Sequence, residues 1–183
     1  ECKILVISAS KERADSFSTF TQRLIAELAG LEYLIPDSSQ RNSKIAFDVG
    51  PAMASHSPSV KSVGITGQIT GSRADLIVAD DIEVLNNSGT QQMRDKLSEQ
   101  VKELDAVIKP EEGSRVLFLG TPQTEDSLYT KLSERGYNVR TWPVRMPSKD
   151  EQEKYGDSLA PFIKALKLPD GEAVDPLRFD EQD

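Results

Sequence analysis

Three short apolar runs constrain the fold of this chain more than any other feature of its sequence. They are residues 4–7 (ILVI), 76–79 (LIVA) and 116–119 (VLFL), and amphipathic segments separate them. Continuous apolar runs of this length are typical of strands that are buried on both faces, as in parallel sheets. Strands that alternate with helices favour a sheet with helices on both sides. We therefore expect an α/β fold with a mostly parallel sheet.

Capping residues and apolar spacing predict the remaining elements. Helices that begin after Ser10, Ser88 and Ser148 are expected to continue to Leu28, Leu104 and Leu166, and another is expected around Leu128 and Leu132. A hairpin is expected at residues 44–57 and a fourth strand at residues 138–142. The sequence contains no repeats and no low-complexity tracts.

Composition excludes several classes of function. The chain has 183 residues and a net charge of -8, so it lacks the basic surface with which a domain coats nucleic acid or an anionic membrane. No apolar run approaches the ~20 residues of a membrane span. The single cysteine, Cys2, allows no disulfide within the chain and is expected to be buried, and Trp142 is expected to anchor packing. A reducing compartment is the natural interpretation.

Acidic residues follow the second apolar run directly. Asp80, Asp81 and Glu83 lie at the end of the predicted strand 76–79. Ligands of parallel α/β sheets collect beyond the carboxyl ends of the strands, so this position favours a site for a metal ion and an activated water. The alternative is structural, because Asp is also a common turn former and helix cap. A preceding glycine-rich loop and two adjacent carboxylates favour the functional interpretation.

The third apolar run ends in a second polar segment, Gly120–Gln123 (GTPQ). If the strands 76–79 and 116–119 are neighbours, the hydroxyl of Thr121 and the amide of Gln123 reach the same crevice as Asp80. They could then sense a phosphate through hydrogen bonds. The alternative is an ordinary proline turn between a strand and a helix.

These motifs resemble a known family. Residues 64–83 (GITGQITGSRADLIVADDIE) and 116–129 (VLFLGTPQTEDSLY), with SASKERAD after the first strand and TWPVRMP near residue 144, follow the order found in the large terminase subunits of tailed bacteriophages. The resemblance is to their ATPase domain, is closest to the DNA maturase B subunits of short-tailed phages, and covers essentially the whole chain. It implies a RecA-like P-loop NTPase fold that binds ATP and Mg²⁺.

The resemblance also implies roles for the acidic residues. Asp80 stands where the family has the Walker B aspartate, which holds Mg²⁺ on the phosphates. Asp81 stands where the family has the catalytic carboxylate that orients the attacking water, and Glu83 is an alternative candidate for that role.

Three further residues match family positions. Thr121 and Gln123 correspond to the motif that couples the state of the γ-phosphate to DNA-gripping elements. Arg73 resembles an arginine that some terminases insert into the site of a neighbouring subunit. The alternative for Arg73 is a solvated surface arginine.

One departure from the family is serious. The phosphate-binding loop G-x-x-x-x-G-K-[ST] does not occur in these 183 residues. In the family it lies just upstream of the strand 4–7, so we expect residues 1–170 to form a partial ATPase domain, incomplete at its N-terminus and inactive alone. Residues 171–183 are expected to form an acidic tail or a linker toward an absent nuclease domain.

The family function is translocation of double-stranded viral DNA into the procapsid by an ATPase motor, whose parent protein is also an endonuclease. The expected partners are viral DNA, the portal protein, the small terminase subunit and further copies in a ring, without a membrane. The expected location is the host cytoplasm during virion assembly rather than the mature virion. A helicase-like DNA translocase and a non-catalytic α/β binding module remain as alternatives.

Overall fold

The computed structural model describes residues 2–179 of the chain. It contains two compact units, Glu1–Lys131 and Leu132–Asp183. Each unit has its own buried residues and is described by itself.

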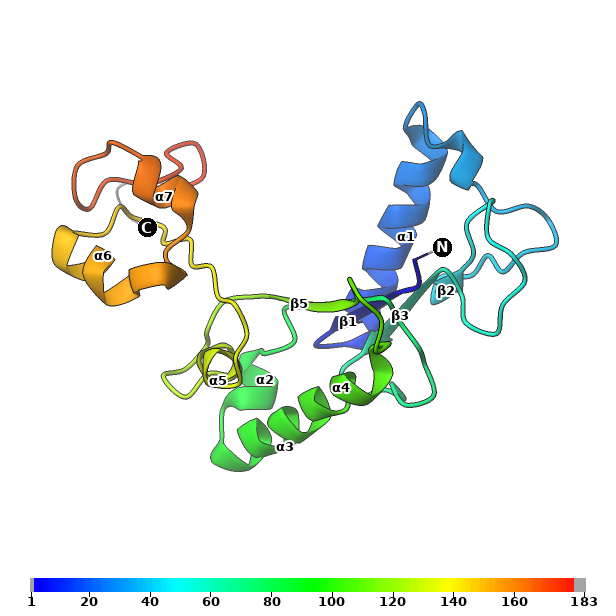
Figure 1. Cartoon of the computed structure of the whole chain (residues 1–183), viewed down its shortest axis with the longest axis horizontal. Coiled ribbons are helices and arrows are strands. Elements are labelled where there is room, and N and C mark those ends of the chain that lie inside the picture. The colour runs from blue at the N-terminus through cyan, green and yellow to red at the C-terminus, as the bar shows by residue number, and fades with distance from the viewer. Residues whose placement is uncertain (1, 180–183) are drawn as a thin grey trace. The chain divides into compact units, whose positions relative to one another are not determined.

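Unit 1 is built on a five-stranded sheet with the order β2-β3-β1-β4-β5 (Figure 1). The strands are β1 (Ile4–Ser8), β2 (Ala46–Phe47), β3 (Val60–Gly64), β4 (Leu76–Asp80) and β5 (Arg115–Leu119). All neighbouring strands are parallel except β2 and β3, which are antiparallel. The predicted α/β class, the mostly parallel sheet and the three apolar strands are confirmed.

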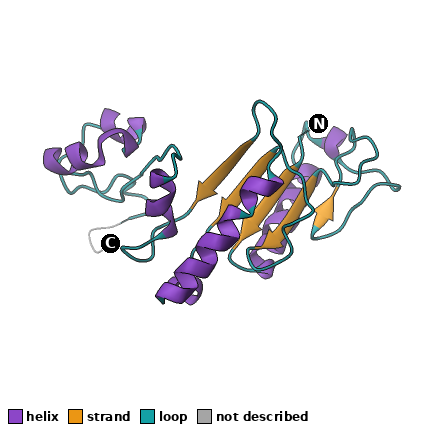
Figure 2. Ribbon diagram, turned by 60° about the horizontal axis from the view of Figure 1, so that its bottom comes forward, coloured by secondary structure: helices purple, strands orange, loops and turns teal. Residues whose placement is uncertain are grey.

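The helices of unit 1 lie on both faces of this sheet (Figure 2). They are α1 (Lys11–Glu27), the 3-10 helix η1 (Glu32–Leu34), α2 (Leu85–Ser88), α3 (Gln91–Lys102) and α4 (Leu104–Val107). Helix α5 (Leu128–Glu134) spans the boundary between the units. None of the helices in residues 2–179 is long and apolar enough to cross a membrane.

One face of the sheet is covered only in part. Helix α1 packs on β3 and β1 through a cluster that contains Val6, Ile25, Phe47 and Val60. Over β4 and β5 the same face is more open, and Leu117 and Leu119 are 45% and 44% exposed. The opposite face, on the side of α3 and α4, is covered more completely: Val116 and Phe118 of β5 are partly buried, and other residues on this side are almost fully buried. They include Leu5, Ile7, Ile77, Ala79, Leu97, Val101 and Leu104.

Unit 2 contains α6 (Lys149–Tyr155), the 3-10 helix η2 (Gly156–Ser158) and α7 (Pro161–Ala165). Its core is formed by Met146, Leu159, Ala160 and Ile163, with Leu166, Leu168 and Val174 packed against them. Residues 171–174 bond to residues 144–146 through backbone groups. The predicted boundary between a partial ATPase domain (1–170) and a tail or linker (171–183) stays a prediction. Residues 180–183 of the expected tail lie outside the described residues.

Several local predictions were wrong. Thr90, not Ser88, caps α3, because the Thr90 hydroxyl accepts the N–H of Met93. The expected strand at residues 138–142 is reduced to one bridge between Thr141 and Leu159. The helix expected after Ser148 begins correctly but ends at Tyr155, where Gly156 adopts a φ of 54°.

The hairpin and two burial predictions also differ from the structure. Strand β2 pairs with β3, which was not predicted as a strand, instead of with a return strand within residues 44–57. Cys2 is exposed because it precedes the buried part of β1. Trp142 is 62% exposed and does not anchor a core.

Truncation of a central β4 residue tests the buried sheet. Ile77 is 0% exposed, so we expect Ile77→Ala to lower the free energy of unfolding by about 2–5 kcal/mol. Ile45→Ala is the matched control, because Ile45 is 46% exposed, and it should cost less than about 1 kcal/mol. Urea unfolding followed by far-ultraviolet circular dichroism measures both. Equal losses in the two variants would contradict the described sheet.

Candidate functional site

The register of the parallel strands gathers polar residues at one edge of the sheet. Ser8 at the end of β1 pairs with Asp80 at the end of β4, and Asp80 pairs with Leu119 at the end of β5. The residues that follow β4 and β5 therefore leave the sheet side by side. The structure brings Asp80 and Asp81 to the same edge as the segment that contains Thr121 and Gln123.

Asp81 makes a sharp turn directly after β4. Its φ of 45° is the one positive φ found at a non-glycine residue in the described chain. Asp tolerates this left-handed conformation better than most residues, and such backbone outliers cluster at functional sites. The N–H of Asp81 donates to the carbonyl of Leu119 at 2.9 Å. The turn is thus tied to the end of β5.

The Asp81 carboxylate faces the first turn of α1. Its Oδ2 lies 3.7 Å from Nη1 of Arg13, and both side chains are more than half exposed. An exposed pair at this distance contributes little to stability. Ser10 caps the same helix by accepting the N–H of Arg13 at 3.3 Å. The start of α1 therefore places a cation beside the two carboxylates.

The environment raises the pKa of Asp80 above its ordinary value. Burial is the main cause, and the negative charge of Asp81 acts in the same direction. The nearby Arg13 opposes both by stabilising the ionised form. Two neighbouring carboxylates at a half-buried edge form a place where an added cation is favoured.

An open hollow of about 530 Å³ lies beside Asp80 on the α1 face of the sheet. Ser8, Ser10, Arg13 and Asp80 are among the residues that line it. Hydroxyl groups, a guanidinium and a carboxylate are the groups that bind a phosphorylated ligand with its metal ion. This hollow is the candidate binding site.

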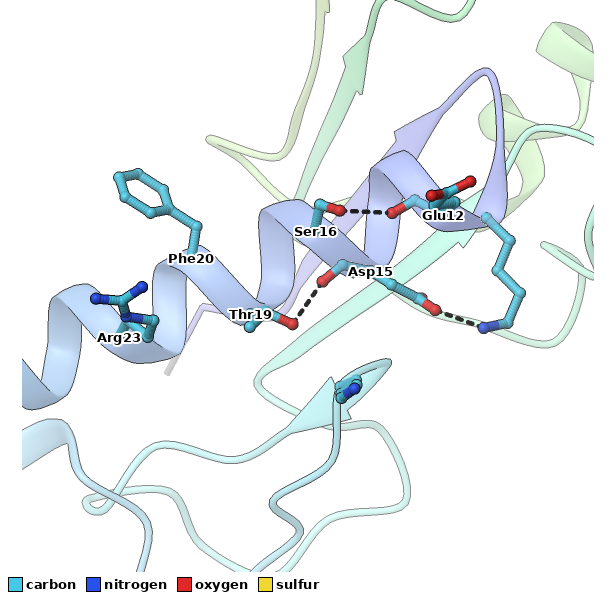
Figure 3. Close-up of a pocket in the computed structure, with 8 residues that line it drawn as sticks. Glu12, Asp15, Ser16, Thr19, Phe20 and Arg23 are labelled. Carbon is cyan, nitrogen blue, oxygen red and sulfur yellow. Dashed lines mark hydrogen bonds and ion pairs between the residues drawn. The ribbon is translucent and has the colours of Figure 1, made fainter.

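A second hollow, of about 650 Å³, runs along the exposed side of α1 (Figure 3). Several of its polar side chains are already engaged with the helix itself. Lys11 pairs with Asp15, and the hydroxyls of Ser16 and Thr19 donate to carbonyls one turn earlier. We therefore do not assign this hollow a ligand.

Glu83 is placed differently from the two aspartates. It is 2% exposed, and its carboxylate accepts the backbone N–H groups of Gln123 at 3.1 Å and of Leu128 at 2.5 Å. It thus joins the chain after β4 to the chain after β5. Sequence spacing alone does not distinguish this arrangement from a catalytic one.

Thr121 and Gln123 lie in an exposed stretch that follows β5. The Gln123 side chain donates to the carbonyl of Thr121 at 3.1 Å. Gly120 allows the ring of Tyr129 to pack closely, since an added Cβ would lie 2.0 Å from the Tyr129 hydroxyl. That hydroxyl donates to the carbonyl of Leu119 at 3.2 Å. The segment therefore folds back over the end of β5.

Arg73 lies away from this edge. It precedes β4, at the amino ends of the parallel strands, and donates to the carbonyl of Ala106 at 2.8 Å. The chain does not bring Arg73 to its own Asp80 and Asp81. Any contact between Arg73 and these carboxylates would have to involve a second copy of the chain.

Sequence reasoning missed two residues near the carboxylates. Arg13 follows the helix cap Ser10 by three positions. The sequence could therefore have identified it as a residue in the first turn of a helix that starts beside the candidate site. Tyr129 was not detectable from spacing. Burial raises its pKa to about 12, and the charges of Asp81, Glu83 and Asp80 contribute in the same direction.

Asp80 and Asp81 could supply part of a ligand set for a metal ion. The residues from 2 to 179 contain no group of three or more His, Cys, Asp or Glu placed to hold a metal ion. Mg²⁺ commonly uses one or two carboxylates and takes its remaining ligands from phosphates and water. Asp80 and Asp81 supply such a partial set.

Comparison with known proteins confirms the resemblance predicted from the motifs. The chain is 51% identical over 190 aligned positions to the large terminase subunit of Enterobacteria phage T3, and the alignment covers the whole chain. The chain spans 32% of the length of that relative. No profile of a known protein family matches the chain.

The pKa shift of Asp80 predicts an unusual gain in stability on substitution. Because its folded pKa is above 3.8, ionised Asp80 destabilises the fold at neutral pH, and this penalty disappears as the pH falls below 3.8. Asp80→Asn should therefore raise the melting temperature at about pH 7 and lose this effect in acid. Thermal unfolding across this pH range measures it.

Asp48→Asn is the contrasting variant. Burial acts to raise the pKa of Asp48, but hydrogen bonds from Arg41 and Ser59 outweigh it and lower the pKa below 3.8. Ionised Asp48 thus stabilises the fold above 3.8, and this contribution is lost as the pH falls through the lowered pKa. Asp48→Asn should lower the melting temperature at neutral pH. A comparable neutral-pH loss in Asp80→Asn would contradict the assigned environment.

Proposed function

We propose that this chain forms part of the ATPase site of a large terminase subunit, the motor that moves double-stranded viral DNA into the procapsid. The observation that carries the proposal is the meeting of Asp80 and Asp81 with the segment after β5 at the carboxyl edge of a parallel sheet. The 51% identity to the phage T3 protein supports the same conclusion. A RecA-like P-loop fold is part of this proposal.

The proposed roles are those implied by the family resemblance, and the positions of the two carboxylates support them. Asp80 holds Mg²⁺, which when bound neutralises phosphate charge, and a bound cation would offset the burial and the Asp81 charge that raise the pKa of Asp80. Asp81 is the more exposed of the two and orients the water that attacks the γ-phosphate. Thr121 and Gln123 respond to the γ-phosphate from the end of the neighbouring strand.

The proposal requires residues that this chain does not supply. The Lys of a phosphate-binding loop must reach the β- and γ-phosphates, and residues 1–183 contain no such loop. We therefore propose that the site is completed by a further segment, and that the chain alone does not hydrolyse ATP. DNA cleavage is assigned to a nuclease domain outside these residues.

The proposed partners are those of a packaging motor. They are viral double-stranded DNA, the portal protein of the procapsid, the small terminase subunit and further copies in a ring, in the host cytoplasm during virion assembly. The net charge of -8 restricts DNA contacts to local positions. Local contacts would allow the motor to release the DNA in each cycle of ATP hydrolysis.

Hydrolysis by a chimera tests the proposal. Residues 1–183 replace the matching stretch of the phage T3 relative, and ATP turnover is measured with linear DNA and procapsids. Asp81→Asn should lower DNA-stimulated turnover by at least about 100-fold, because the attacking water loses its carboxylate, while ATP still binds. Glu112→Gln is the control, since Glu112 is an exposed acid ahead of β5.

The other outcomes identify the alternatives. Unchanged turnover in Asp81→Asn would place the catalytic carboxylate elsewhere. A chimera that binds no nucleotide would favour a non-catalytic binding module. Stimulation by single-stranded DNA without procapsids would favour a helicase-like translocase.

A mixing experiment tests Arg73. If Arg73 completes the site of a neighbouring copy, Arg73→Ala should lower turnover in the chimera by roughly 1,000-fold, the usual contribution of such an arginine. Mixing Arg73→Ala with Asp81→Asn should restore turnover, because some interfaces then combine an intact arginine with an intact carboxylate. If the mixture shows no more turnover than either variant alone, Arg73 does not act between copies.

A further inference from the structure

Glu83 is a buried acid for which the proposed chemistry has no direct use. Acidic side chains are rarely fully buried unless their charge is compensated, yet Glu83 is 2% exposed. Removing a carboxylate from water is costly, so a buried one requires strong hydrogen bonds. The contacts of Glu83 therefore show what its burial achieves.

Both carboxylate oxygens accept hydrogen bonds from the chain that follows β5. Oε1 accepts the N–H of Gln123, and Oε2 accepts the N–H of Leu128, which is the first residue of α5. These donors lie 40 and 45 positions along the chain from Glu83. Charge-assisted bonds of this kind are about twice as strong as neutral ones. One carboxylate thus fixes both ends of the loop 124–127.

The backbone around Glu83 is also fixed. Ile82 is 0% exposed, and its carbonyl accepts a bond from the Asn87 side chain at 2.8 Å. The same Asn87 side chain accepts the N–H of Val84 at 2.9 Å. Glu83 is therefore held between two anchored neighbours, two residues beyond Asp81. A displacement of the Asp81 turn cannot be absorbed at Glu83 without breaking these bonds.

We infer that Glu83 is a positioning residue that makes the Asp80–Asp81 turn and the segment from Thr121 to Leu128 move together. This inference rests on the proposed function. It assigns to Glu83 the link between the carboxylates of Asp80 and Asp81 and the phosphate-sensing segment after β5. Because Glu83 is 2% exposed whereas Asp81 is exposed, this inference leaves the orientation of the water to Asp81. A shift of the Asp80–Asp81 turn on binding of a metal-bound nucleotide would then be passed by Glu83 to the segment after β5.

Hydrogen exchange on the chimera tests the link directly. Exchange of the amides at residues 120–129 is measured with and without ATP and Mg²⁺, next to nucleotide affinity and DNA-stimulated turnover. In the unsubstituted chimera, exchange in this segment should change when nucleotide binds. This response is the reference against which the Glu83 variants are compared.

Two substitutions remove the link in steps. Glu83→Gln retains one acceptor oxygen, and Glu83→Met has a similar size but retains none. We expect the nucleotide-dependent change in exchange to shrink in Glu83→Gln and to be absent in Glu83→Met, with nucleotide affinity changed less than about threefold. Turnover should fall roughly 100-fold in Glu83→Met, the usual effect of a misplaced group. Glu125→Gln, an exposed acid in the same segment, is the matched control.

The outcomes separate this inference from the proposed function. If Glu83→Met keeps the exchange response and the turnover, the link is overturned while the proposed function stands. If turnover is lost but the exchange response remains, Glu83 acts on the reaction itself and the positioning role is wrong. If Glu83→Met lowers the melting temperature so far that nucleotide no longer binds, the test rests on Glu83→Gln. That variant must then show a smaller exchange response at normal nucleotide affinity, and an unchanged response overturns the link. If the unsubstituted chimera binds no nucleotide, both fail.

Discussion

The parallel register of β1, β4 and β5 is the constraint on which the rest of unit 1 depends. Parallel strands end at the same edge, so residues that are distant in sequence leave the sheet together. The buried residues Leu5, Ile7 and Ile77 fix this register, because a shift by one residue would exchange the faces on which the side chains pack. The position of Asp80 beside Leu119 is therefore a consequence of core packing.

The sequence predicted the parts of the fold that depend on local patterns. The apolar runs identified β1, β4 and β5, and Ser10 identified the start of α1. β3 was missed because its residues (VKSVG) alternate weakly, and it is stabilised by pairing with β1 and β2 rather than by its own composition. In unit 2, Gly156 ends a helix that apolar spacing alone would continue, because it adopts a positive φ.

The candidate site was predictable to a similar extent. Asp80, Asp81 and the segment after β5 were placed correctly at one edge because their positions follow from strand ends. The hydrogen bonds of Glu83 depend on donors 40 and 45 residues away, and no local pattern encodes such a contact. Arg73 was linked to the site by resemblance, whereas its location at the opposite edge follows from strand direction.

The ionisation of Asp80 depends on what covers the partly open face of the sheet over β4 and β5. Burial already raises the pKa of Asp80, and Leu117 and Leu119 on the same face are nearly half exposed. An apolar cover alone would remove more water and favour the neutral acid, which is a poorer metal ligand. A cation brought with the cover would reverse this effect, because it stabilises the ionised carboxylate. Covering Asp80 is thus less costly when a cation arrives with the cover than when an apolar surface arrives alone.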